Sequence, residues 1–183
     1  MVGVLFALLL AAMMAVGSGA NFNSTSANPG NVVTAGALSH DNSKLGAAVL
    51  TVSKLKPGQS DTGTVKITNT GNVDGVFSVA RTMVSDSTGA LTPPNPFAAH
   101  LNLKIVDVTT STPVVVYDNL LSAMTGPKPA GTISPGTAAA HTYEFTVTFV
   151  DANVANPALP NGADNAFQGA RVEANFNWEG VTN

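Results

Sequence analysis

The sequence predicts an all-β fold: a single antiparallel β-sandwich of the jelly-roll type, with short helical turns in its loops and an N-terminal signal helix. Residues 170–179 alternate apolar and polar side chains without a break, and residues 141–149 do the same. A period of two is typical of strands with one face in a core and the other in water. Turn dipeptides such as Pro57-Gly58 recur at short intervals. This spacing favours a sandwich over alternating strands and helices.

Residues 1–20 have the pattern of a signal peptide. Residues 2–16 are almost entirely apolar, and small residues, Ser18 and Ala20 among them, follow. The apolar run is too short for a comfortable membrane span and suits the core of a leader that signal peptidase removes. A signal peptide normally opens with positive charge, whereas the first cation here is Lys44. The true start and the cleavage site therefore stay open, and a retained membrane anchor is the alternative.

The composition excludes several classes of partner and scaffold. Charged residues make up 10% of the chain, compared with about a quarter in ordinary soluble domains. The net charge is −3 and no basic run occurs, which argues against nucleic acid and anionic lipid as partners. The chain has no cysteine, so it cannot be a disulfide scaffold. A surface with so few charges repels other copies weakly, which permits close association.

Eight segments combine β-branched or aromatic residues with turn signals at their ends, and each is expected to form a strand. They comprise residues 32–38, 47–52, 63–69, 76–84, 101–108, 114–117, 140–150 and 170–179. Apolar residues that alternate with polar ones are expected to form the core: Val65, Ile67, Tyr143, Phe145, Val147, Phe149, Val172, Phe176 and Trp178. For Trp178, an exposed ligand-binding platform is the alternative.

Proline and glycine mark the connections between strands. Three prolines in residues 92–96 exclude a central strand there, and a short helical turn is expected at residues 97–100. Residues 126–129 are expected to form a second stiff loop. Residues 164–169 are expected to form one helical turn, from which Phe167 closes one end of the core.

A weak internal repeat links two Pro-Gly turns to two strands. In both copies the first inward residue, Val65 or Tyr143, follows its proline by eight positions. A Pro-Gly turn before an alternating strand also explains this likeness without a duplication, and both alternatives stay open. In either case both strands are expected inside the sandwich. Residues 71–75 separate two strand patterns and are expected to form a hairpin turn.

No group of residues has the pattern of a catalytic or cofactor site. The three histidines, His40, His100 and His141, lie in unrelated segments outside any His-Glu-x-x-His zinc motif. The sequence lacks a Gly-x-Ser-x-Gly nucleophile elbow, and cysteine chemistry is absent by count. We therefore expect no catalytic residue and no cofactor. His141 is expected to be a partly buried residue at a strand end.

Two metal sites stay as alternatives to solvated turns. His40 and Asp41 are adjacent and could ligate one ion, although a solvated turn explains the pair more simply. Asp151 and Asp164 could hold calcium together with loop carbonyls, but no EF-hand spacing supports this site. No metal is therefore included in the prediction.

Four segments, taken in order, resemble the TasA/camelysin family of secreted bacterial matrix proteins. They are residues 19–38 with their Asn-Pro-Gly-Asn-Val-Val motif, residues 55–72 with Leu-Lys-Pro-Gly and Asn-Thr-Gly-Asn, residues 143–149, and residues 164–179 with Asp-Asn-Ala-Phe-Gln-Gly and Phe-Asn-Trp-Glu. Single motifs of this kind occur in many sandwiches. Their combination covers nearly the whole chain and is more specific.

The resemblance implies an exported jelly-roll protein, residues 37–183, that assembles into extracellular fibres of a biofilm matrix. In such fibres the N-terminal segment of one copy is thought to add as a strand to the next copy. Here residues 21–36 would be the donor segment, with Phe22, Val32 and Val33 as its apolar contacts. The expected partners are other copies of the chain and a minor matrix or anchoring protein at the cell surface. The leader would block the donor until its cleavage.

Two other functions stay open beside this expectation. A monomeric cell-surface adhesin or carbohydrate-binding sandwich would need exposed aromatic side chains, whereas Trp178 and Tyr143 are expected in the core. A camelysin-like secreted metallopeptidase would need a zinc site, and the sequence has no motif for one. The expected function is therefore structural and not enzymatic.

Overall fold

The computed structural model describes residues 34–51, 55–87, 96–150, 167 and 169–182. The chain divides into two units, residues 1–35 and 36–183, and only Thr34 and Ala35 of the first are described. The expected signal peptide, the donor contacts Phe22, Val32 and Val33, and the Asp151–Asp164 pair lie outside the described residues. The account below concerns the second unit.

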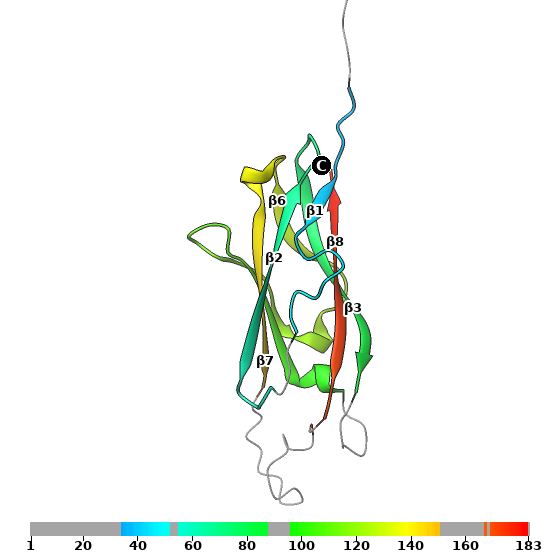
Figure 1. Cartoon of the computed structure of the whole chain (residues 1–183), viewed down its shortest axis with the longest axis vertical. Coiled ribbons are helices and arrows are strands. Elements are labelled where there is room, and N and C mark those ends of the chain that lie inside the picture. The colour runs from blue at the N-terminus through cyan, green and yellow to red at the C-terminus, as the bar shows by residue number, and fades with distance from the viewer. Residues whose placement is uncertain (1–33, 52–54, 88–95, 151–166, 168, 183) are drawn as a thin grey trace, which may run out of the picture. The chain divides into compact units, whose positions relative to one another are not determined.

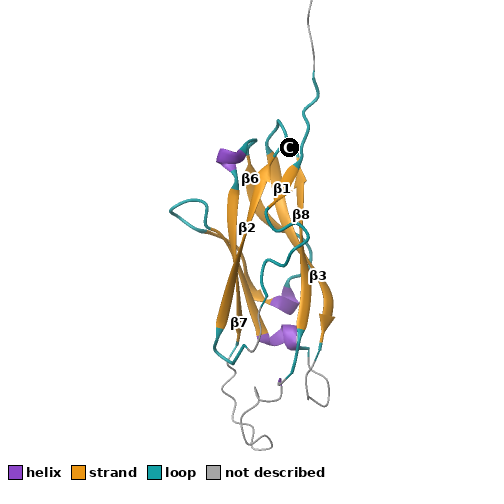
Figure 2. Ribbon diagram, viewed as in Figure 1, coloured by secondary structure: helices purple, strands orange, loops and turns teal. Residues whose placement is uncertain are grey.

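Two antiparallel sheets pack as an all-β sandwich (Figure 2). The five-stranded sheet has the order β1 (His40–Asn42), β2 (Ser60–Asn69), β7 (His141–Phe149), β4 (Leu101–Asp107) and β5 (Val114–Leu120). The three-stranded sheet has the order β6 (Lys128–Ile133), β3 (Gly75–Asp86) and β8 (Val172–Val181). Three short 3₁₀ helices connect strands: η1 (Phe97–His100), η2 (Leu121–Ala123) and η3 (Thr137–Ala139).

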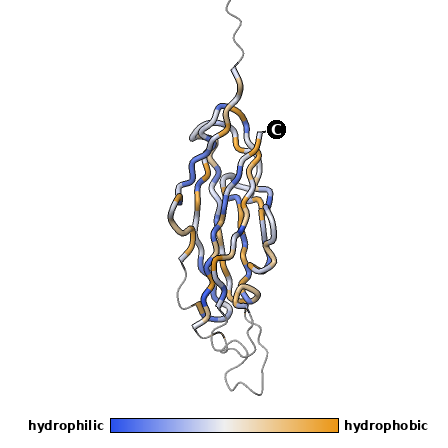
Figure 3. Tube along the Cα trace, turned by 90° about the vertical axis from the view of Figure 1, so that its right-hand side faces the viewer, coloured by the Kyte–Doolittle hydropathy of each residue, from blue (hydrophilic) through white to orange (hydrophobic). Residues whose placement is uncertain are grey.

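The core lies between the two sheets, and the alternation along the strands positions it. Hydrophobic and hydrophilic positions alternate along much of the Cα trace (Figure 3). Of the expected core residues, those on β2 and β7 are buried: Val65, Ile67, Tyr143, Phe145, Val147 and Phe149. Those on β8 are half-buried against the same cluster: Val172, Phe176 and Trp178. The difference between the two groups indicates that the β8 side of the core is less completely covered.

The two Pro-Gly repeats become neighbours in the five-stranded sheet. β2 and β7 pair along their length, with Val65 opposite Tyr143. The turn at Gly58 joins the same pair, because its N–H donates to the Phe149 carbonyl at 2.8 Å. Both repeat strands therefore lie inside the sandwich, as expected.

Two expected strands are wrong where the structure describes them. Residues 34–39 and 45–51 are not strands, and β1 begins only at His40. Near residue 37 the backbone bonds to a loop instead, since the Asn72 N–H donates to the Ala37 carbonyl at 2.9 Å. The second segment lies against the inward side of β2 at Gly63, so it cannot pair beside that strand.

The expected stiff loop at residues 126–129 is also wrong in part, because β6 begins at Lys128 and includes Pro129. Proline is tolerated on an edge strand, because such a strand makes backbone hydrogen bonds with a neighbour on one side only. β6 pairs only with β3 and is such an edge. The register shifts between Phe77 and Ser78 opposite Pro129 and Gly131, which accommodates the missing donor.

The hairpin expected at residues 71–75 is a connection between the sheets. β2 belongs to the five-stranded sheet and β3 to the three-stranded sheet, so the two strands do not pair. The fully buried amide of Asn69 fixes the crossing, because its Nδ2 donates to the carbonyls of Val73 and Ile133 at 2.8 Å. Turn residues predicted a change of direction correctly, but they did not indicate which sheet the chain enters.

Aromatic side chains close one end of the sandwich. Phe167 is buried and stacks on Phe97 of η1 at 5.5 Å between ring centroids. Its ring also meets Phe149 edge-on at 5.9 Å. This is the end-closing position expected for Phe167, and the 3₁₀ turn at residues 97–100 is likewise confirmed.

Candidate functional site

Among the described residues, strand β8 has a free edge along its whole length. It pairs on one side with β3, from Val76 opposite Val181 to Asp86 opposite Val172 (Figure 1). Within the described ranges no strand lies on its other side. Half of the residues in such a strand direct their N–H and C=O groups outward, where they can bond a further strand. β8 is ten residues long and is therefore a substantial template.

The two faces of β8 differ in character. Glu173, Asn175, Asn177 and Glu179 are exposed on the outer face, whereas the residues between them point toward the core and are half-buried. Trp178 packs on Tyr143 of the opposite sheet at 4.6 Å between centroids, so it is not an exposed ligand platform. The strand thus has apolar side chains on the side where the sandwich is incompletely filled.

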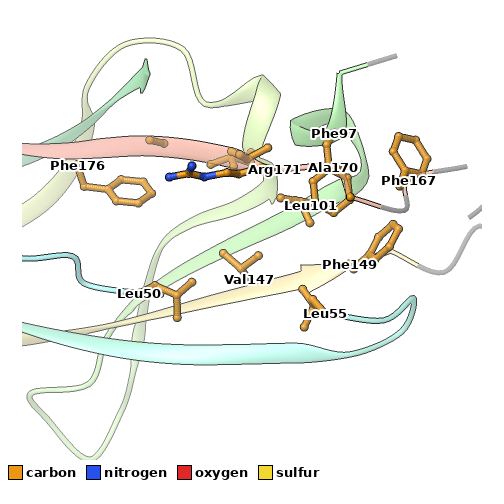
Figure 4. Close-up of a pocket in the computed structure, with 14 residues that line it drawn as sticks. Leu50, Leu55, Phe97, Leu101, Val147, Phe149, Phe167, Ala170, Arg171 and Phe176 are labelled. Carbon is orange, nitrogen blue, oxygen red and sulfur yellow. The ribbon is translucent and has the colours of Figure 1, made fainter. Parts of the chain in front are cut away.

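An apolar groove of about 520 Å³ runs beside β8 and between the sheets (Figure 4). One wall comes from the start of β8, and the other comes from β7, β4 and the segment between β1 and β2. The lining residues are Leu50, Leu55, Phe97, Leu101, Leu121, Val147, Phe149, Phe167, Gly169, Ala170, Arg171, Val172, Ala174 and Phe176. Four expected core residues, Val147, Phe149, Val172 and Phe176, therefore line the groove.

The groove has one charged residue in its lining, Arg171, whose guanidinium is 3.0 Å from the Glu173 carboxylate. The side chain of Arg171 is 76% exposed, so this pair lies at the rim. The interior has no charge to attract an ionic ligand. A groove of this kind takes apolar side chains, and the adjacent free edge offers backbone hydrogen bonds.

His141 and Asp107 form the clearest polar pair, with Nδ1 and Oδ2 2.6 Å apart. The other carboxylate oxygen of Asp107 accepts hydrogen bonds from the N–H and hydroxyl of Thr109. The hydroxyl therefore contacts the carboxylate, whereas a nucleophile would need to contact the imidazole. The pair joins the end of β4 to the start of β7, and His141 is partly buried, as expected.

The other histidines lie apart from each other. His40 meets Phe77 edge-on at 5.5 Å, and the ring of His100 lies 4.2 Å from that of Phe167. His40 and Asp41 are consecutive in β1 instead of in a turn. Neighbours in a strand point to opposite faces, so these two side chains do not converge on one ion. Within the described part of the chain, no three His, Asp or Glu residues gather as a metal site would require.

No family model matches this chain. No curated protein matches it either. Among the residues that the structure describes, no helix is long and apolar enough to cross a membrane. The case for a function therefore depends on the groove and the free edge of β8.

Sequence reasoning missed the groove, although it identified several of its residues. Leu50 and Leu55 were assigned to a strand and to a turn, and no pattern indicated that they face β8. The only signal was the unusually regular alternation at residues 170–179. That pattern predicts a half-buried strand but not the absence of a neighbour.

Proposed function

We propose that this chain is a secreted structural protein whose jelly-roll sandwich assembles into extracellular matrix fibres by β-augmentation. The N-terminal segment of one copy would add to the free edge of β8 in the next. The observation that supports this most directly is an unpaired ten-residue edge beside an apolar groove. The sequence resemblance to the TasA/camelysin family supports the same function independently.

The donor segment has enough length for this role. Residues 21–35 span about 50 Å when extended, and the ten residues of β8 span about 33 Å. Pro29 has no N–H and interrupts the ladder once. The donor segment would therefore pair with β8 of the next copy in two stretches, one on each side of Pro29. We call this contact between copies the joint.

Apolar contacts would supply much of the affinity. Phe22 is the largest apolar side chain in the donor segment, and burial of a phenylalanine contributes about 2–3 kcal/mol. Each backbone hydrogen bond adds a net of about 1 kcal/mol. Association costs at least about 4 kcal/mol, so a stable joint needs both contributions.

The place where the chain enters the sandwich favours a head-to-tail arrangement. Leu38 packs beside Gly75 and Gly180, at the end of β8. The groove is lined by the start of that strand, from Gly169 to Phe176. The donor segment would extend from its own subunit near one end of β8 and enter the groove of the next subunit near the other end of β8. The contact would therefore join two different surfaces of the subunit. Such heterologous contacts produce open filaments when the rotation between copies does not close.

Deletion of the donor tests the proposal. A chain of residues 21–183 is expected to form filaments visible by electron microscopy, whereas a chain starting at Ala37 is expected to fold and stay monomeric. Circular dichroism and light scattering separate folding from assembly. Filaments formed equally well by both chains would contradict the proposal.

Single substitutions in the donor sharpen this test. Phe22→Ser removes the largest apolar contact and is expected to slow filament growth by about tenfold or more, because about 1.4 kcal/mol corresponds to each factor of ten. Asn23→Ser changes the neighbouring polar side chain and is the matched control. Equal effects of the two substitutions would show that Phe22 does not enter the groove.

A further inference from the structure

The segment that follows β1 crosses the inward side of β2. We call residues 45–51 the strap; it is the cyan coil after β1 in Figure 1. Its Val49 carbonyl lies so close to Gly63 that a Cβ added there would clash with the oxygen. Gly63 is on the same face of β2 as Val65 and Ile67, whose side chains are buried in the core. The strap backbone therefore lies between β2 and the interior of the sandwich.

One strap side chain, Leu50, forms part of the groove wall. Val49 and Leu50 are half-buried and pack against the core, whereas Leu45 is 84% exposed. Leu50 lies across the groove from Phe176 of β8 (Figure 4). A strand added to β8 would lie about 4.8 Å from it and direct alternate side chains into this same space. The position of the strap therefore limits the space that donor side chains would enter.

Few polar contacts hold the strap. Its start is fixed because Ser43 bonds Lys66 twice, through the Ser43 N–H and the Ser43 hydroxyl. The Ala47 N–H closes a turn on Lys44, but the backbone of residues 48–51 makes no hydrogen bond with other described residues. Apolar packing without a ladder is typical of segments that open at low free energy. A donor strand would bring the ladder that the strap lacks.

We infer that the strap is an autoinhibitory wall segment that narrows the donor groove of the free subunit and must shift before a donor strand inserts. The inference rests on the proposed function and adds its regulation. A subunit with the strap in place binds a donor only through the fraction of time that the groove is open. The apparent affinity for the donor segment is reduced in proportion to that fraction, which delays the first association between free copies.

Gly63→Ala tests the inference because it moves the strap and changes neither β8 nor the donor. Alanine is compatible with a strand, but its Cβ clashes with the Val49 carbonyl, so the strap has to shift. Thr62→Ala is the matched control, since Thr62 is exposed on the other face of the same strand. Hydrogen exchange of the Ala47 N–H, which bonds the Lys44 carbonyl at the start of the strap, is expected to accelerate in the first variant only.

Donor binding is the decisive measurement. A fluorescent peptide of residues 21–35 is added to the mature chain, kept dilute enough to stay monomeric. Gly63→Ala is expected to bind the peptide about tenfold faster than the unsubstituted chain or Thr62→Ala. Equal binding rates despite faster exchange of the Ala47 N–H would overturn the inference and leave the proposed function standing. No binding by any of the three chains would overturn the proposed function itself.

A second variant covers the case in which Gly63→Ala does not fold. Val49→Ser weakens the packing of the strap without a backbone clash, because it removes an apolar contact with the core. It is expected to accelerate exchange and peptide binding in the same direction. Slower or unchanged binding in this variant would count against the inference as well.

Discussion

The amide of Asn69 joins three segments at the point where the chain crosses between the sheets. Its Nδ2 donates to the carbonyls of Val73 and Ile133, and its Oδ1 accepts the Gly71 N–H at 2.9 Å. All three backbone groups depend on one fully buried side chain. An aspartate would lose both donors, and an alanine would leave every partner unsatisfied.

Asn69→Ala is therefore expected to lower the free energy of unfolding by about 2–4 kcal/mol, because buried partners lose their hydrogen bonds. Urea denaturation of the dilute chain measures the change. Asn177→Ala removes an exposed hydrogen bond to Thr82 and is expected to cost less than about 0.5 kcal/mol. A similar cost for the two variants would show that the crossing does not depend on Asn69.

Tyr143 ties the two sheets together from the middle of the core. Its hydroxyl donates to the Ala130 carbonyl of β6 at 2.8 Å, and its ring is fully buried. Burial raises the pKa of Tyr143 far above its usual value, and the nearby Asp107 carboxylate raises it further. The folded protein therefore keeps this proton at pH values where the unfolded chain loses it.

This difference predicts that stability falls above about pH 10, the ordinary pKa of tyrosine, by up to about 1.4 kcal/mol per pH unit. The sign follows because the unfolded state then binds fewer protons than the folded state. Tyr143→Phe is expected to be about 1 kcal/mol less stable at neutral pH, and the gap should narrow from about pH 10 to 11. Urea titrations at about pH 7, 10 and 11 measure it. A constant gap would contradict the assignment.

At the scale of elements, β8 differs from the other long strands because described residues pair with only one of its sides. β2, β3, β4 and β7 each have partners on both sides, although β1 covers only the last three residues of β2. β8 therefore combines the length of a central strand with the position of an edge. Exposed edges of this length are usually blocked by charge, proline or a bulge. The inward positions of β8 carry neither charge nor proline, and the one register shift in its ladder with β3 lies between Met83 and Ser85 of β3.

A positive charge on the inward side of β8 is expected to block a donor strand. Ala174→Lys directs a cation toward the groove, from which it can reach solvent along its own aliphatic stem. Filament growth is expected to slow by about tenfold or more. Asn175→Lys adds the same charge to the exposed face, and it should change growth by less than about twofold. Light scattering compares the two; equal rates would place the joint elsewhere.

At the scale of the whole molecule, the sequence predicts the sheets better than their arrangement. Alternation identified β7 and β8, and runs of β-branched or aromatic residues between turn signals identified β2, β3 and β4. The strand predicted at residues 47–52 is wrong, because an apolar run has the same local sequence pattern in a strand as in an irregular segment such as the strap. The sequence did not predict β6, because Pro129 is tolerated only in an edge strand. Which strand lies at an edge depends on pairing between segments far apart in the sequence.

The candidate site was less predictable than the core. Val147, Phe149, Val172 and Phe176 were expected inside, but a core residue and a groove residue have the same apolar character. The groove lies beside an edge of β8 that has no neighbour among the described residues, and strand order depends on pairing between distant segments, which local sequence patterns do not reveal. A donor segment was predicted only through the family resemblance.

Assembly by this route is expected to depend weakly on salt. Residues 21–35 contain no charged side chain, and the charged residue of the groove lining, Arg171, already pairs with Glu173. Growth rates between about 0.05 M and about 0.5 M NaCl should differ by less than about threefold, because no ion pair forms in the joint. Light scattering at matched concentrations measures this. A steep loss of growth with salt would indicate a charged interface instead.

The chain contains a single tryptophan, and Trp178 is located on β8 against Tyr143. Its indole Nε1 is buried and has no acceptor among the described residues. Emission from this ring therefore reports on the edge strand alone, without a label or an engineered probe. A change in the hydration of Trp178 shifts the wavelength of its fluorescence emission. The emission wavelength can therefore follow events at the strand where copies are proposed to meet.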